Sequence, residues 1–157
     1  MRILAIDPGT SCGYALSIDG QIVSGTWNLR GGRFEGGGMR FIRMRNALDE
    51  IGPVDRLYFE EVRRHLSTDA AHVYGGIIAM ITAWCEENQI PYQAISVGTI
   101  KKCATGKGNA DKAAMLNAAI IRWPEQNIKD DNQADALWIL EASKLPPAAP
   151  KKKRSRE

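Results

Sequence analysis

A short apolar run that ends in a turn-forming carboxylate constrains this chain more than any other part of it. Residues 3–6 read Ile-Leu-Ala-Ile with no helical period, which is typical of a strand buried on both faces of a sheet. Asp7 follows directly, and Pro8-Gly9 then predicts a turn. A carboxylate at the end of a buried strand is costly unless a cation meets it. Asp7 is therefore either a turn residue or a metal ligand.

Length and composition indicate one ordinary globular domain. The chain has 157 residues, enough for a sizeable core. Cys12, Cys85 and Cys103 have no paired spacing, which argues against a zinc site and for a reducing, cytoplasmic setting. The sequence has no apolar run long enough to span a membrane and no signal-peptide pattern at its start, so we expect no membrane contact.

Basic charge is concentrated at the end of the chain. Residues 151–157 carry five basic groups and one acid, a net charge of +4, which leaves 16 basic and 17 acidic residues before them, a net charge of −1. The Pro-rich stretch that precedes this run favours polyproline or disorder. We expect a domain over residues 1–145 and a disordered linker and tail over 146–157. The tail either binds nucleic acid non-specifically or has no function.

The expected elements give a mixed α/β fold that does not alternate enough to be doubly wound. Asp19-Gly20 is a strong hairpin signal between two of the strands. Five glycines make residues 30–38 a mobile loop, and the absence of a following Lys-Ser/Thr argues against a nucleotide phosphate loop. We expect strands at 3–6, 13–17, 21–28, 57–59 and 90–95. We expect helices at 39–51, 70–88, 97–103 and 130–144, and one more that starts at Asn109 or Asp111 and runs to Trp123.

Acidic residues also stand at the ends of two later elements. The strand at 57–59 runs into Glu60-Glu61, and the last helix begins with Asp130-Asp131. Asp135 lies among apolar residues on that same helix, where an unpaired carboxylate is rare. A hard-oxygen site for Mg²⁺ or Mn²⁺ explains these acids together with Asp7.

Four segments in this order resemble the RuvC-type Holliday junction resolvases. They are residues 5–14 (Ala-Ile-Asp-Pro-Gly-Thr-Ser-Cys-Gly-Tyr), 58–62 (Tyr-Phe-Glu-Glu-Val), the basic segment 97–112, and 132–137 (Asn-Gln-Ala-Asp-Ala-Leu). The resemblance covers roughly residues 1–143. It implies an RNase H-like mixed five-stranded sheet flanked by helices, a homodimer, and divalent-metal cleavage of branched DNA. The compact size and basic extension favour a phage-encoded member.

The resemblance also implies the metal ligands, residue by residue. Asp7 matches the first ligand, Glu60 the second and Asp135 the last. Many members carry an acid or histidine three residues before the last Asp, where this chain has Asn132. We expect Asp131, one residue earlier, to replace that ligand, and the carbonyl of Asn132 is the alternative.

The same comparison implies basic residues that contact DNA. Lys107 is the strongest of them, because it lies between two glycines that let a phosphate approach, and we expect it or Lys112 to neutralise charge during cleavage. The complete expected set is Arg63, Arg64, Lys101, Lys102, Lys107 and Lys112.

The function expected from this resemblance is paired, metal-dependent nicking of four-way junctions to leave 5′-phosphate and 3′-hydroxyl ends. Two Mg²⁺ ions, replaceable by Mn²⁺, would be held per site. The helix at 70–88 is a candidate dimer face, although its apolar stripe equally suits the core. Three alternatives stay open: an RNase H-fold nuclease for RNA or flaps, a junction-binding protein without catalysis, and an actin-like or sugar-kinase ATPase, for which the chain is too short.

Overall fold

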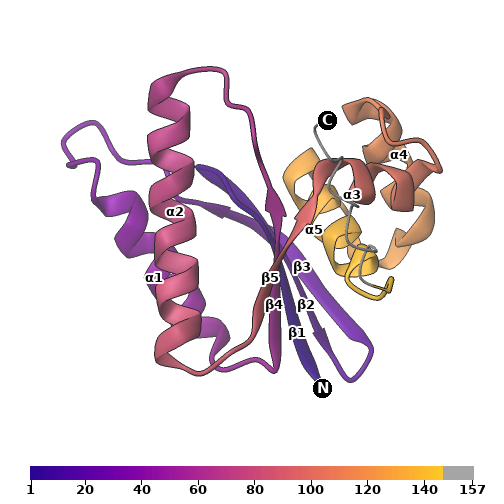
Figure 1. Ribbon diagram of the computed structural model, residues 1–157, viewed down its shortest axis with the longest axis horizontal. Helices are drawn as coiled ribbons and strands as arrows, with labels where there is room; N and C mark the ends of the chain where they lie inside the picture. The colour runs from indigo at the N-terminus through magenta and orange to yellow at the C-terminus, as the bar shows by residue number, and fades with distance from the viewer. Residues whose placement is uncertain (147–157) are drawn as a thin grey trace, which may run out of the picture.

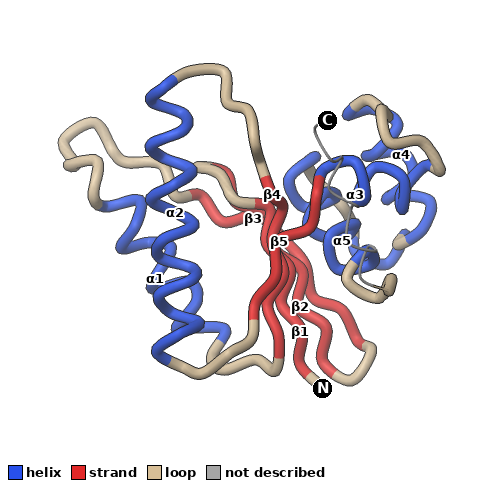
Figure 2. The backbone as a smooth tube through the Cα atoms, viewed as in Figure 1, coloured by secondary structure: helices blue, strands red, loops and turns tan. Residues whose placement is uncertain are grey.

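A computed structural model describes residues 1–146 as three layers. A twisted sheet forms the middle layer, two helices cover one of its faces, and three helices cover the other (Figures 1 and 2). All but the first residue of the expected linker and tail, 146–157, lies outside the described residues. Within residues 1–146, no helix combines the length and the apolar composition needed to cross a membrane.

The sheet is mixed and five-stranded, as expected from the sequence. Its order is β3-β2-β1-β4-β5. The first three strands form an antiparallel meander, whereas β4 pairs parallel to β1 and β5 pairs parallel to β4. The strands are β1 Arg2–Asp7, β2 Ser11–Ile18, β3 Gln21–Asn28, β4 Arg56–Glu61 and β5 Tyr92–Ser96.

The hairpin between β2 and β3 turns where the sequence predicts. Asp19 and Gly20 both have positive φ angles, 50° and 90°, as a tight hairpin turn requires. Two boundaries differ from expectation. β2 begins at Ser11 rather than at Gly13. The fifth strand begins at Tyr92 rather than at Ile90, because the Ile90 amide donates to the Cys85 carbonyl at the end of the preceding helix.

Five α-helices follow the expected positions within a few residues. They are α1 Met39–Ile51, α2 Thr68–Glu87, α3 Val97–Thr105, α4 Lys112–Arg122 and α5 Asp131–Ala142, with a 3-10 turn at Pro124–Gln126. Asp111 and Asp130 cap α4 and α5 by accepting backbone N–H bonds. The cap of α2 is Ser67, whose hydroxyl accepts the Ala70 amide, so the helix begins two residues before the expected residue 70.

Alternation along β1 divides the core between the two faces of the sheet. Leu4 and Ile6 point into the cluster under α1 and α2, whereas Ala5 points into the cluster under α3, α4 and α5. The apolar stripe of α2, including Ile77, Ile81 and Trp84, packs in the first cluster. The stripe therefore belongs to the core, which was one of its two expected roles.

Small residues set how closely the layers approach. A Cβ atom at Gly76 would lie 2.4 Å from the Phe41 ring, so this glycine allows α1 to pack on α2. On the other face, Ala5 and Ala15 are fully buried beneath α5. Their small side chains let α5 lie directly on β1 and β2, and α5 carries two of the expected metal ligands.

Candidate active site

Parallel pairing of β1 with β4 brings two carboxylates together at one edge of the sheet. Ile6 is paired with Phe59, so the next residues along the two strands, Asp7 and Glu60, are neighbours at the carboxyl ends. Asp7 is the last residue of β1, as predicted, and Glu60 is the penultimate residue of β4.

Helix α5 supplies the third carboxylate from above the sheet. Asp7 is paired with Gly13 on β2, and a Cβ atom at Gly13 would lie only 1.9 Å from the carbonyl oxygen of Asn132. The first turn of α5 thus packs directly against the β2 backbone at Gly13, beside Asp7. One turn further along the helix, Asp135 reaches the same cleft.

These side chains line a cleft of about 330 Å³ that also contains two lysines. Its apolar wall includes Val97, Ile100 and Met115, which come from α3 and α4. Its polar lining is Ser11 together with Asp7, Glu60, Lys101, Lys112, Asn132 and Asp135. The structure therefore brings together three of the four expected carboxylates and two of the expected lysines.

The carboxylates in this cleft destabilise one another's charged forms. Burial raises the pKa of Asp7 well above its usual range, and Asp135, Glu60 and Asp131 raise it further. Burial also raises the pKa of Asp135 to about 7, with added repulsion from Glu60 and Asp131. The pKa of Glu60 is raised by burial too, against the attraction of Lys101 and Lys112. A cation bound among these groups would relieve this repulsion.

Asp131 is engaged differently from the other three acids. Its carboxylate pairs with Lys112 across an Nζ–Oδ2 distance of 3.1 Å. This bond raises the pKa of Lys112. Asn132, the alternative fourth ligand, lines the cleft instead. Both assignments of the fourth ligand stay predictions.

The donor chemistry suits a hard divalent cation. Asp7, Glu60 and Asp135 offer carboxylate oxygens, and Asn132 adds an amide, which are the donors preferred by Mg²⁺ and Mn²⁺. Within residues 1–146, no three Asp, Glu, His or Cys side chains already form a metal-binding group.

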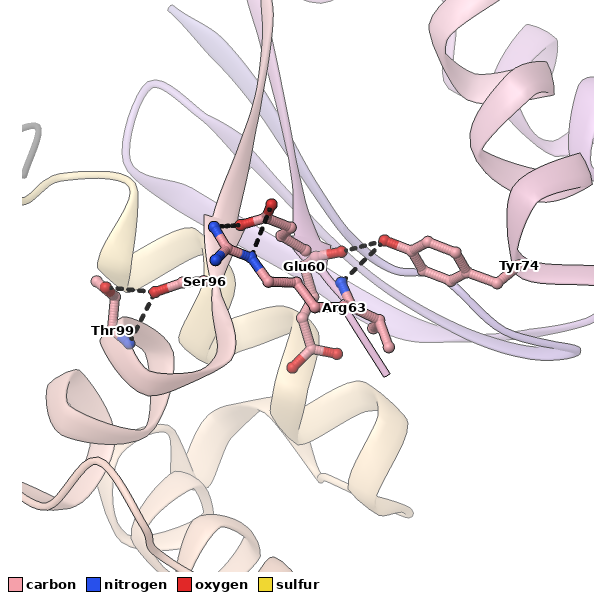
Figure 3. A network of polar contacts seen from close by, with 7 residues as sticks. Glu60, Arg63, Tyr74, Ser96 and Thr99 are labelled. Atoms are coloured by element: carbon pink, nitrogen blue, oxygen red, sulfur yellow. Dashed lines mark hydrogen bonds and ion pairs between the residues drawn. The ribbon is translucent and has the colours of Figure 1, made fainter. Parts of the chain in front are cut away.

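The two adjacent glutamates of β4 have different surroundings. Glu60 faces the cleft, whereas Glu61 pairs with Arg63 at 3.2 Å and lines a separate cavity beside β5. Tyr74 of α2 fixes this strand end, because its hydroxyl donates to the Glu60 carbonyl at 2.8 Å and accepts from the Val62 amide (Figure 3). The sequence offered no signal for this role of Tyr74.

The fold of this chain is similar to those of solved structures. The chain aligns with RuvC from Thermus thermophilus in complex with a Holliday junction substrate, with a TM-score of 0.72 and 20% identity over 90% of this chain and 92% of that one. A second structure of the Thermus thermophilus protein gives a TM-score of 0.70 and 19% identity over the same shares. The chain has the fold of the RuvC-type resolvases. This confirms the expected RNase H-like architecture.

A solved structure from yeast has a similar fold. The yeast mitochondrial Holliday junction resolvase aligns with a TM-score of 0.60 and 17% identity over 90% of this chain and 76% of that one. No protein-family model matches the sequence, and neither does any curated protein.

The basic residues expected on this RuvC-type fold are distributed around the cleft rather than gathered in it. Lys101 and Lys112 line it. Lys102 and Lys107 are exposed on α3 and on the loop that follows, outside the lining. Arg63 and Arg64 are exposed in the segment between β4 and α2. DNA contact by these residues stays a prediction.

A polar network that sequence reasoning missed holds the start of α5 in this RuvC-type fold. Asp130, the N-cap, accepts bonds through Oδ1 from the Thr26 hydroxyl of β3 at 2.7 Å and from the Gln133 amide at 2.8 Å. Gln133 is the single polar residue in the buried core of residues 1–146, with 4% exposed. Its side chain donates to Ser24 at 3.0 Å and accepts from the Lys129 amide at 3.0 Å.

This network ties the α5 N-terminus to the β2–β3 hairpin. The helix carries Asp131, Asn132 and Asp135, so its placement decides where these candidate ligands lie. The only sequence signal was Asp130 as a helix-starting residue. Its partner Thr26 is 104 residues away in the chain.

Proposed function

We propose that this protein is a metal-dependent endodeoxyribonuclease that resolves Holliday junctions and other branched DNA, acting in DNA recombination and repair in the cytoplasm of a bacterial or phage-infected cell. One observation carries the proposal: Asp7, Glu60 and Asp135 converge in one cleft of a RuvC-type fold, beside two lysines. Three half-buried carboxylates that repel one another are suited to binding a divalent cation and not to stabilising the fold.

The cleft residues have separable roles in this proposal. Asp7, Glu60 and Asp135, with Asp131 or Asn132, would hold two Mg²⁺ ions, replaceable by Mn²⁺. Bound there, such ions would supply an activated water and stabilise the leaving 3′-oxygen, which would leave 5′-phosphate and 3′-hydroxyl ends.

Lysines would orient the scissile strand. Lys101 and Lys112 lie at the cleft, where each offers an ammonium group to a phosphate oxygen. Lys112 is 85% exposed and pairs with Asp131 at 3.1 Å, so an incoming phosphate would compete with Asp131 for its ammonium group. Lys107, exposed on the loop between α3 and α4, would contact the next phosphate and neutralise charge as the bond breaks.

Two copies of the chain would place two such sites on two strands of one junction, which yields paired nicks. Helix α2 is the proposed contact between the copies. Its inward side is core, and its outward side presents Gly75, Ala79 and Ala83 at four-residue spacing. Small residues in this spacing allow close helix packing.

A cleavage assay with matched substrates tests the function. We expect Mg²⁺-dependent, paired cleavage of four-way DNA and weaker cleavage of three-way and flap DNA. Asp7→Asn should abolish cleavage while it retains junction binding, because the carboxylate acts on metal and not on DNA. Full cleavage by this variant would refute the site. Preference for RNA or flaps, or binding without cleavage by the wild type, would replace the proposed function with one of its alternatives.

A further inference from the structure

The glycine-rich segment after β3, residues 30–38, carries a built turn at its tip. The Glu35 amide donates to the Gly32 carbonyl at 3.0 Å, and the Gly32 amide donates back to the Glu35 carboxylate at 2.7 Å. Arg43 of α1 bonds the same carboxylate at 2.6 Å. The segment was expected to be a mobile loop, but these bonds close its tip into a turn and attach it to α1.

This turn presents an aromatic side chain and a cation to solvent. Phe34 is 94% exposed, and the guanidinium of Arg33 lies 5.5 Å from the centre of its ring. Glu35 is the only acid in residues 30–40, and Arg43 already pairs with it. Arg30, Arg33 and Arg40 give these residues a net charge of +2.

The turn lies at the same end of the sheet as the carboxylate cleft, on the α1 side of the sheet rather than the α5 side. The Leu29 amide donates to the Thr10 carbonyl at 2.8 Å, so the segment leaves the sheet beside the turn that follows Asp7. Figure 1 shows this segment at the upper end of the sheet, on the α1 side, with the connection from β4 to α2 on the same end.

We propose that residues 30–38 form a second DNA-contacting surface, on which Phe34 stacks on an unpaired base at the branch point and Arg30 and Arg33 hold the flanking phosphates. The inference rests on the proposed function. Positive charge around the tip complements a phosphate backbone, and an aromatic ring offers every base a stacking surface without sequence preference.

A protein partner fits this surface less well. Stable protein interfaces bury roughly 1,000 Å² or more in total. Phe34 is flanked by Arg33 and Glu35 and then by glycines, so the tip offers one apolar side chain and little further area. One aromatic ring and several arginines suit nucleic acid better than a protein surface.

Binding in EDTA tests the proposal without cleavage, using a four-way junction that carries 2-aminopurine at the branch point. Phe34→Ala should weaken junction binding about tenfold and leave duplex binding unchanged, since one base–aromatic stack is lost. In wild type, 2-aminopurine fluorescence should rise as the base leaves its neighbours in the DNA and stacks on Phe34, and this rise should disappear in Phe34→Ala. Phe34→Tyr should restore the junction affinity and the fluorescence rise.

Two further variants separate stacking from charge. Arg33→Ala should weaken junction and duplex binding alike and reduce the salt dependence of both by about one phosphate contact. Val23→Ala is the matched control, since Val23 is a 56% exposed apolar residue on β3 towards the hairpin end, and it should behave as wild type.

The outcomes are distinct. If the wild type cleaves junctions and Phe34→Ala binds them as tightly as wild type, this inference is wrong and the proposed function stands. A change of oligomeric state in Phe34→Ala, seen by sedimentation, would make the turn a contact between copies and also overturn it. A wild type that neither binds nor cleaves branched DNA would overturn the proposed function and this inference together.

Discussion

A Cβ atom at Gly13 would lie 1.9 Å from the carbonyl oxygen of Asn132, so α5 touches β2 at a position that tolerates no side chain. Gly13 is also the β2 partner of Asp7. The contact therefore sets the distance between the acid on the sheet and the acids on the helix. Packing and the candidate chemistry depend on the same glycine.

Gly13→Ala should lower both stability and cleavage. The added methyl must push α5 from the sheet, and overpacking of this kind costs roughly 1–3 kcal/mol. That corresponds to a Tm lower by about 5 °C for a chain of this size. We expect the single-turnover cleavage rate to fall even at temperatures where the variant is fully folded, because Asp135 moves with the helix.

Gly98→Ala is the control for this change. A Cβ atom at Gly98 meets nothing within 4 Å, and the residue lies in α3, where alanine is preferred to glycine. We expect a Tm equal to or above that of wild type, with cleavage retained. Equal behaviour of the two alanine variants would contradict the packing argument.

Glu60→Gln and Glu61→Gln should differ sharply despite being neighbours. Glu60 lines the cleft, whereas Glu61 pairs with Arg63 and lines another cavity. Cleavage by saturating protein in Mg²⁺ should be abolished in Glu60→Gln and unchanged in Glu61→Gln. If only Glu61→Gln loses cleavage, the second carboxylate is Glu61 and the assignment to Glu60 is wrong.

Asp135→Asn should stabilise the metal-free protein in a pH-dependent way. The pKa of Asp135 is about 7 in the folded chain against an ordinary value of 3.8. The folded state therefore holds a proton that the unfolded state loses between these values, so this group's contribution to stability falls as pH rises from about 4 to about 7.

The measurement is Tm in EDTA across that range. Asparagine cannot ionise, so Asp135→Asn should exceed wild type in Tm at about pH 8 and match it near pH 4. Excess Mg²⁺ at about pH 8 should raise the Tm of wild type and have a smaller effect on the variant. A gain confined to acid pH would contradict the direction of the pKa shift.

The fourth ligand can be decided by two substitutions compared at matched Mg²⁺. If Asp131 binds metal, Asp131→Asn should raise the Mg²⁺ concentration for half-maximal cleavage by at least about tenfold, and Asn132→Ala should have little effect. If the Asn132 side chain is the ligand, Asn132→Ala should raise that Mg²⁺ concentration and Asp131→Asn should have little effect. Lys112→Met serves as a check, since removal of the Lys112 pairing alone should not reproduce the Asp131→Asn effect.

Thr26→Val should loosen the start of α5. It removes the hydroxyl that donates to Asp130 at 2.7 Å while it keeps the side-chain shape, a loss of about 1 kcal/mol. Cleavage should slow at saturating DNA without a change in junction affinity, and Thr26→Ser should restore the rate. Thr82→Val is the control, because Thr82 donates to the Ile78 carbonyl within α2, and it should lower Tm without slowing cleavage.

Local pattern was sufficient for much of the fold. Apolar runs located the strands, and glycine or proline marked about half of the element ends. Gly52, for example, ends α1 with a φ of 74°. Boundaries shifted by a few residues where several neighbouring residues have capping chemistry. Helix α2, expected from residue 70, begins at Thr68, because Ser67 is in extended conformation and its hydroxyl accepts the Ala70 amide.

The site divides in the same way. Asp7 and Asp135 were expected from their places at or on buried elements, and Glu60 rather than Glu61 from the resemblance to the resolvases; all three lie in one cleft. Thr26, Tyr74 and Gln133 were not predicted, because their hydrogen bonds join elements that no local pattern connects. The fourth ligand stays a prediction for a related reason: Asp131 and Asn132 are adjacent in sequence but differ in what faces them.

By itself, the sequence determined which residues are candidates for the chemistry and which elements hold them, because strand ends, helix starts and acids among apolar neighbours are local properties of the chain. The tertiary structure alone decided how these groups meet. Parallel pairing of β1 with β4 sets Asp7 beside Glu60, and a glycine on β2 lets α5 bring Asp135 to them. Those distances depend on side-chain volume and hydrogen bonding between segments far apart in the chain, which only the folded packing fixes.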